Sequence, residues 1–164
     1  MKNTFLLLSV LLPLAAPGQA HHATGSMPVI TTSGSFFALS VADLDASTRW
    51  YTEKLGLKVI RQMPHTDATR SSMALLQGGG LTVELVRQDD AQPLGKLLPA
   101  GRGTLYVYGI FKVGVVVNDF DRTLAALRAR GVEVAIGPFP KRPGQPANVI
   151  LRDNAGNLLQ VFGK

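Results

Sequence analysis

The chain has 164 residues, and its 17 Lys and Arg against 11 Asp and Glu give a formal net charge of +6. This length favours one domain, and a hydrophobic content of 46% with 17% charged residues is ample for a packed core and excludes a disordered chain. The absence of cysteine excludes disulfides, so the core alone must hold the fold. No basic cluster or basic helix stands out, which argues against a nucleic-acid partner.

Residues 1–20 have the features of a secretory signal peptide. Lys2 is followed by an apolar run from Phe5 to Leu14, and Gly18 and Ala20 are small residues at −3 and −1 of a cleavage site. The run is about ten residues long, against the ~20 that span a bilayer, so we expect cleavage rather than a retained anchor. The mature chain would have 17 − 1 = 16 basic and 11 acidic residues, a formal +5. We expect it to be periplasmic or secreted, with no membrane partner, and its charge favours anionic ligands or a negative envelope surface.

Residues 21–35 are rich in Thr, Ser and Gly and predict a flexible lead-in. Cleavage after Ala20 would make His21 the first residue, and a terminal amine with an imidazole can chelate copper. No motif places a third histidine nearby, so an accidental histidine is the simpler interpretation. The sequence leaves copper binding by His21 open.

Residues 36–88 predict one strand, one helix and three more strands. Phe36–Val41 is apolar nearly throughout, which is typical of a strand. Asp43 or Asp45 can cap the following helix, and Gly56 can end it in a left-handed conformation. The three further strands are predicted at residues 57–60, 72–76 and 81–86.

Residues 89–103 contain Pro93, Gly95, Pro99 and Gly101, a composition that indicates a linker. The second half then repeats the order of the first. It contains a strand-rich segment at 104–117, a helix at 119–130, an irregular loop at 137–146, and strands at 132–135, 148–152 and 158–162.

The two halves share motifs at one constant offset. Val41-Ala-Asp-Leu-Asp45 returns as Val117-Asn-Asp-Phe-Asp121, an offset of 117 − 41 = 76. Glu84 and Gln160 occupy equal places in a second repeated segment, and 160 − 84 is again 76. Two matches at one offset indicate an internal duplication. We expect one α+β domain of two pseudo-symmetric halves, with helices on one face of a curved sheet and a cleft enclosed by the other faces.

These motifs resemble the vicinal oxygen chelate superfamily, which includes glyoxalases, bleomycin-resistance proteins and extradiol dioxygenases. The resemblance covers about residues 36–162. It implies two tandem βαβββ modules forming a cupped, half-barrel mixed sheet with helices outside. The single domain would span 36–164, with module 1 at 36–88, the linker at 89–103 and module 2 at 104–162. The fold alone does not fix an activity. The resemblance rests on Val41–Ser47, Trp50-Tyr51, Leu55-Gly56, Val117–Asp121, Arg130–Val132 and Arg152–Asn157.

In metal-dependent members of this superfamily, four strand positions converge on a divalent metal. The resemblance places Phe36, Glu84, Lys112 and Gln160 at these positions. Phenylalanine has no donor atom, and a lysine ammonium has no lone pair and repels a cation. One carboxylate and one amide are too few ligands for a hard cation. We therefore expect no metal and no cofactor.

Without a metal, the same four side chains suggest a binding site. Lys112 can attract an anion, Gln160 can donate from its amide, and Phe36 can form an apolar wall, which together suit a small-molecule cleft. Alternatively, Glu84 and Lys112 simply pair with each other, an arrangement that often adds little net stability.

Tyr106 and Tyr108 alternate on the predicted strand at 104–117, so both would face one side. They are further candidates for the ligand-binding wall, although packing or a dimer contact is the simpler interpretation.

Three functions remain open from the sequence. The first is an exported protein that binds a small organic ligand, with an anion favoured, in the cleft between the modules and without a metal. The second is a metal-independent lyase or isomerase of the glyoxalase type that uses Glu84 and Lys112 as acid and base. The third is a structural protein with a vestigial cleft. A monomer and a homodimer are both compatible with two modules in one chain.

Overall fold

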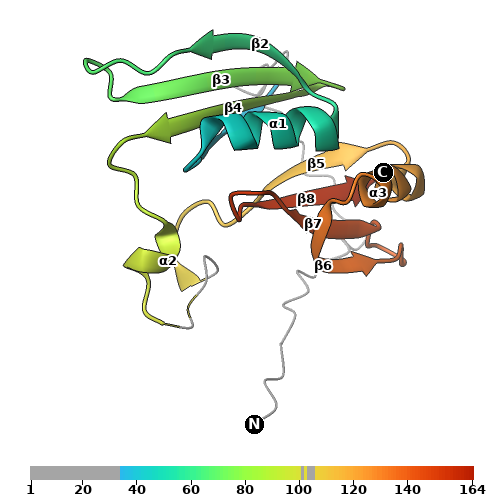
Figure 1. Ribbon diagram of the computed structural model, residues 1–164. Coiled ribbons are helices and arrows are strands. Elements are labelled where there is room, and N and C mark those ends of the chain that lie inside the picture. The colour runs from blue at the N-terminus through green and yellow to red at the C-terminus, as the bar shows by residue number, and fades with distance from the viewer. Residues whose placement is uncertain (1–33, 101, 103–105) are drawn as a thin grey trace, which may run out of the picture. The chain divides into compact units, whose positions relative to one another are not determined.

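A computed structural model describes residues 34–100, 102 and 106–164 (Figure 1). The predicted signal peptide, His21 and most of the predicted lead-in lie outside the described residues. The described parts of both modules belong to one compact unit.

Module 1 is a four-stranded mixed sheet with one helix. The strand order is β1-β4-β3-β2, in which β1 runs parallel to β4 and the other neighbours are antiparallel. Its elements are β1 (Phe36–Ser40), α1 (Leu44–Leu55), β2 (Lys58–Met63), β3 (Ser71–Gly78) and β4 (Leu81–Gln88).

Module 2 repeats this order and pairing in a second sheet, β5-β8-β7-β6, after a short linker helix α2 (Leu94–Leu97). The register also repeats, because Val113 pairs with Leu159 and, 76 residues earlier, Phe37 pairs with Val83. The expected α+β fold of two βαβββ modules is therefore confirmed. The elements are β5 (Val113–Val117), α3 (Phe120–Ala129), β6 (Glu133–Phe139), β7 (Asn148–Arg152) and β8 (Leu158–Gly163).

The repeated aspartates start the two long helices. The Asp43 side chain accepts a hydrogen bond of 2.8 Å from the Ala46 N–H, and Asp119 accepts one of 3.0 Å from the Arg122 N–H. Each bond satisfies a backbone donor that the first helical turn leaves free. α1 ends at Gly56, whose φ of 75° is the left-handed conformation that glycine adopts at low cost.

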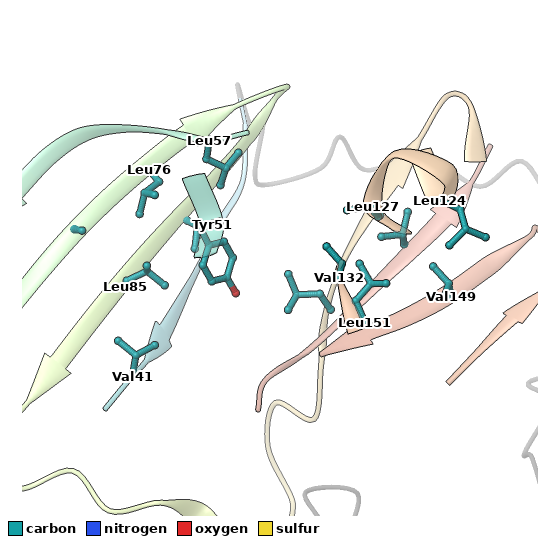
Figure 2. Close-up of a cluster of buried hydrophobic side chains, with 14 residues drawn as sticks. Val41, Tyr51, Leu57, Leu76, Leu85, Leu124, Leu127, Val132, Val149 and Leu151 are labelled. Carbon is teal, nitrogen blue, oxygen red and sulfur yellow. The ribbon is translucent and has the colours of Figure 1, made fainter. Parts of the chain in front are cut away.

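The helices cover one face of each sheet, where strand alternation places the apolar side chains. In module 1, Tyr51 of α1 and Leu85 of β4 are both 0% exposed, and Figure 2 shows them together with Leu57 and Leu76. In module 2, Leu124, Leu127 and Val132 are buried with Val149 and Leu151 (Figure 2). The alternate residues of β1 and β5, among them Phe36 and Val116, are exposed.

Two strand predictions were wrong in their extent. The strand expected at 104–117 begins only at Val113, because β8 pairs with the chain from that residue onward. Residues 106–109 form a turn and a bend instead, so Tyr106 and Tyr108 do not alternate on a strand. In the other direction, β6 continues to Phe139 into the predicted loop, with two register irregularities, the second of which spans Gly137 and Pro138.

Candidate functional site: a groove between the modules

A groove of about 970 Å³ lies between the two modules. Module 1 contributes the start of β1, the end of α1 and the turn between β3 and β4. Module 2 contributes β5, one side of α3 and part of β8. β5 is an edge strand, so residues of both its faces line the groove. The groove therefore differs from the expected cleft, which was to be enclosed only by the sheet faces that carry no helix.

Three of the four predicted positions line this groove. They are Phe36 at the start of β1, Lys112 immediately before β5, and Gln160 on β8. Glu84 of β4 does not line it. Within the described residues, no ion pair within 4.0 Å joins Glu84 to Lys112.

The charged residues of the groove all have one sign. Lys54 and Arg130 lie at the ends of α1 and α3, Arg122 lies in the first turn of α3, and Lys112 precedes β5. No Asp or Glu is among the lining residues. None of the four cations takes part in an ion pair in the part of the chain that the structure describes. A concave surface with one sign of charge concentrates ligands of the opposite sign.

The rest of the lining is mainly apolar, with one directed amide. Val113, Val115 and Leu159 belong to the apolar lining. Gln160 is 7% exposed, and its Nε2 donates a hydrogen bond of 3.0 Å to Asn148 Oδ1. This bond fixes the orientation of the amide. A mostly apolar pocket with a few directed polar groups is the usual form of a small-molecule site.

The sequence analysis missed three of the four cations. Lys54 and Arg130 are 76 residues apart, the same offset that relates the repeated motifs, and this signal would have paired them. Arg122 has no such signal, because the equivalent position in the first half is Ala46. Its place in the groove follows from the packing of α3.

The two tyrosines proposed as ligand-binding residues do not line the groove. Tyr106 is 63% exposed and Tyr108 is fully exposed. The Arg102 guanidinium lies 4.8 Å from the centre of the Tyr106 ring, a cation–π contact on the surface.

A smaller cavity of about 590 Å³ lies in module 1 at the start of α1, lined by Asp43, His65, Ser72 and Arg87 among others. Nε2 of His65 contacts Asp89 Oδ2 at 3.0 Å, and Arg87 Nη1 contacts Asp89 Oδ1 at 2.7 Å. The hydrogen bond from His65 and the contact with Arg87 hold the pKa of Asp89 below its ordinary value. The contact between His65 and Asp89 therefore connects the β2–β3 loop to the end of β4.

The groove residues do not fit the divalent metal of the metal-dependent relatives. Phe36 and Lys112 occupy two of the four positions and offer no lone pair to a cation. Among the described residues, no three His, Cys, Asp or Glu side chains come together in a way that would hold a metal ion.

The duplicated βαβββ modules and the groove between them define a class of two-module α+β proteins. The sequence pattern of the Glyoxalase/Bleomycin resistance protein/Dioxygenase superfamily matches residues 34–161, and the chain belongs to this superfamily. A search of curated proteins found no match.

Solved structures give the same fold. A glyoxylase/bleomycin resistance protein/dioxygenase domain from Frankia sp. EAN1pec superposes with a TM-score of 0.62 at 22% identity, covering 82% of this chain and 93% of its own. A glyoxalase family protein from Enterococcus faecalis gives 0.57 at 20% identity, covering 77% and 94%. A genomically encoded fosfomycin resistance protein from Listeria monocytogenes gives 0.57 at 18% identity, covering 80% and 94%. At these identities the likeness concerns the fold.

Proposed function

We propose that this protein is an exported binding protein that holds a small organic anion with an apolar body in the groove between its modules, without a metal. The observation that carries this proposal is the charge of the groove. Four cations and no carboxylate line it, so an anionic ligand would supply the missing negative charge. Its volume of about 970 Å³ lies near the upper end of the range for small-molecule sites, which is roughly 300–1,000 Å³.

Two of the four cations, Lys112 and Arg122, are suited to meet the ligand, and Lys112 also stands at a position that the family resemblance pointed to. Lys54 Nζ and Arg130 Nη1 already donate hydrogen bonds to backbone carbonyl oxygens. Lys112 makes no side-chain hydrogen bond with another described residue, and its Nζ lies 5.2 Å from the centre of the Phe111 ring. The acidic group of the ligand would lie near Lys112, and its apolar part would contact Phe36 and the valines of β5.

The catalytic alternative has less support. A lyase or isomerase using Glu84 and Lys112 needs both side chains within reach of one substrate. Glu84 is not part of the groove lining, and no ion pair within 4.0 Å joins it to Lys112 in the described structure. Export rests on the signal-peptide pattern of residues 1–20.

The test uses the chain that begins at His21 and pairs of ligands that differ in charge. Benzoate and hexanoate are compared with benzamide and hexanamide by calorimetry and thermal shift. The acids should bind and raise the melting temperature, and the amides should not. Lys112→Met should weaken binding of the acids about tenfold, which corresponds to ~1.4 kcal/mol.

Lys58→Met is the matched control, because Lys58 is exposed on β2 and does not line the groove. Equal loss of affinity in both variants would contradict a specific role for Lys112. Metal analysis of the same preparation provides a second test. Stoichiometric nickel, zinc, iron or manganese in the purified protein would overturn the metal-free site.

A further inference from the structure

Exposed apolar side chains are concentrated in the chain segment that joins β4 to β5. Each of six large hydrophobic residues there is at least 40% exposed, and Leu97 at 68%, Ile110 at 86% and the fully exposed Tyr108 are the extremes. We call this set the linker patch. Its members are Leu94, Leu97, Tyr106, Val107, Tyr108 and Ile110.

The same stretch of chain carries only positive charge. No Asp or Glu occurs between residues 91 and 118, whereas Lys96, Arg102 and Lys112 lie within it. The contact between Arg102 and the Tyr106 ring places a cation directly beside one aromatic member of the patch. The linker patch is therefore apolar, aromatic and basic.

This combination fits an anionic lipid surface. Leucine and isoleucine side chains enter the boundary between headgroups and acyl chains, and tyrosine rings prefer the headgroup level. Lysine and arginine are attracted to the negative surface potential of anionic lipids. An apolar patch of this kind on a soluble domain usually marks an interaction site.

The charges also weigh against a contact between the patches of two copies. A two-fold contact would bring Lys96, Arg102 and Lys112 of both copies together, and the linker offers no carboxylate to compensate them. Like charges placed opposite each other disfavour such a contact.

We propose that the linker patch docks this protein peripherally on an anionic phospholipid surface. Within the described residues, no helix is both long enough and apolar enough to cross a membrane. In Figure 1, α2 lies clear of the strands of both sheets, which leaves it accessible to a flat surface. This differs from the sequence-based expectation of no membrane partner, and it does not depend on the ligand of the groove.

The test is co-sedimentation of the chain that begins at His21 with phospholipid vesicles. Residues 1–20 are omitted because their own apolar run would bind a bilayer. The protein should sediment with vesicles of phosphatidylglycerol and phosphatidylcholine but not with phosphatidylcholine alone. Salt at about 1 M, where the screening length is only ~3 Å, should release it.

Leu97→Ser with Tyr108→Ser should lower the bound-to-free ratio at least tenfold. Ile60→Ser is the matched control, because Ile60 is 54% exposed on β2 and lies outside the patch. Circular dichroism verifies that all variants are folded. No sedimentation of the unmodified chain, unchanged sedimentation of the double variant, or an equal loss in Ile60→Ser would overturn the proposal.

Light scattering in the absence of vesicles tests whether a second copy of this chain, and not a membrane, covers the linker patch. If the double variant converts a dimer to a monomer, the patch is a contact between copies and the membrane proposal is wrong. Neither Leu97 nor Tyr108 lines the groove. Binding of organic acids by the double variant therefore tests the proposed function separately.

Discussion

Lys54 and Arg130 each donate a hydrogen bond to the other's backbone carbonyl oxygen. Arg130 Nη1 lies 3.1 Å from the Lys54 oxygen, and Lys54 Nζ donates to the Arg130 oxygen. The two residues are 76 positions apart, the offset of the internal repeat. The pseudo-two-fold axis of the domain therefore passes between them. Each module supplies the cation that satisfies a free carbonyl at the C-terminal end of the other module's helix, where positive charge is favourable.

Replacing either cation should loosen the contact between the modules. Lys54→Met and Arg130→Met each remove one of the two hydrogen bonds and should lower the free energy of unfolding by about 0.5–1.5 kcal/mol. Urea denaturation measures the change. The double variant should depart from additivity, because the two bonds are neighbours. Arg128→Met, on the exposed side of α3, should change stability little, and an equal effect there would contradict this account.

A buried hydrogen bond also joins the modules. The Tyr51 hydroxyl donates to Asp153 Oδ2 at 2.9 Å, and Tyr51 is 0% and Asp153 4% exposed. Tyr51→Phe keeps the ring packing but leaves the Asp153 carboxylate with one donor fewer, so unfolding should become easier by about 1–3 kcal/mol. Tyr108→Phe, at a fully exposed position, is the matched control. If both variants unfold at the same urea concentration as the unchanged protein, the bond contributes nothing to stability.

The same tyrosine predicts a loss of stability in alkali. Burial, followed by the nearby Asp153 carboxylate and their hydrogen bond, raises the pKa of Tyr51 well above its ordinary value. The folded state then keeps the phenol proton, whereas the unfolded state releases it above about pH 10. This contribution to stability is complete below pH 10 and falls by ~1.4 kcal/mol per pH unit above it. Tyr51→Phe should show a shallower decline in urea titrations between pH 9 and pH 11. An unchanged slope would show that Tyr51 is not buried as described.

Local signals in the sequence were enough for most of the fold. Asp43 or Asp45 was expected to cap the first helix, because capping needs only a carboxylate near the first turn, and the structure shows Asp43 in that role and Asp119 in the same role in module 2. The hydrogen bonds between the modules could not be predicted from such local signals. Nothing near Tyr51 in the sequence indicates Asp153, which lies 102 residues away. These bonds depend on how the two finished modules pack.

The candidate site was predictable only in part for the same reason. The family resemblance, supported by the repeat offset of 76 residues, pointed to Phe36, Lys112 and Gln160, and all three line the groove. Glu84 shares that offset but lies outside the groove, because strand register fixes the face of a side chain and not what the other module brings near it. Tyr106 and Tyr108 were wrongly expected on a strand. Tyrosine has a high strand propensity, but in the described structure no neighbouring strand pairs with residues 106–109.

The contacts of Asp89 predict that the stability of the folded protein falls at low pH. Its hydrogen bond with His65, together with the contact with Arg87, lowers its pKa, so the folded state holds the carboxylate more firmly than the unfolded chain does. The resulting stability is present above the ordinary value of about 3.9 and is lost as the pH falls through the lower folded value. His65→Leu removes the hydrogen-bond donor and should move the Asp89 titration, followed by NMR of the carboxyl carbon, towards the ordinary value. Arg61→Leu forms the control, since Arg61 has no ion pair with Asp89 in the described structure. A titration that His65→Leu leaves in place would refute the assignment.

Gly114 lies where β5 and β8 approach each other closely, so we predict that a larger residue at this position destabilises the protein. Gly114 pairs with Gln160, and an added Cβ would lie 3.1 Å from the Gln160 carbonyl oxygen and 3.7 Å from its Cβ. The nearest atom belongs to the backbone, so Gly114→Ala must displace a strand and should cost about 1–3 kcal/mol in urea denaturation. Because Gln160 lines the groove, the same variant should also bind organic acids more weakly. Gly95→Ala in α2 is the matched control, since a Cβ there meets nothing within 4 Å and alanine favours a helix. A Gly114→Ala protein as stable as Gly95→Ala would mean that the two strands can separate without cost.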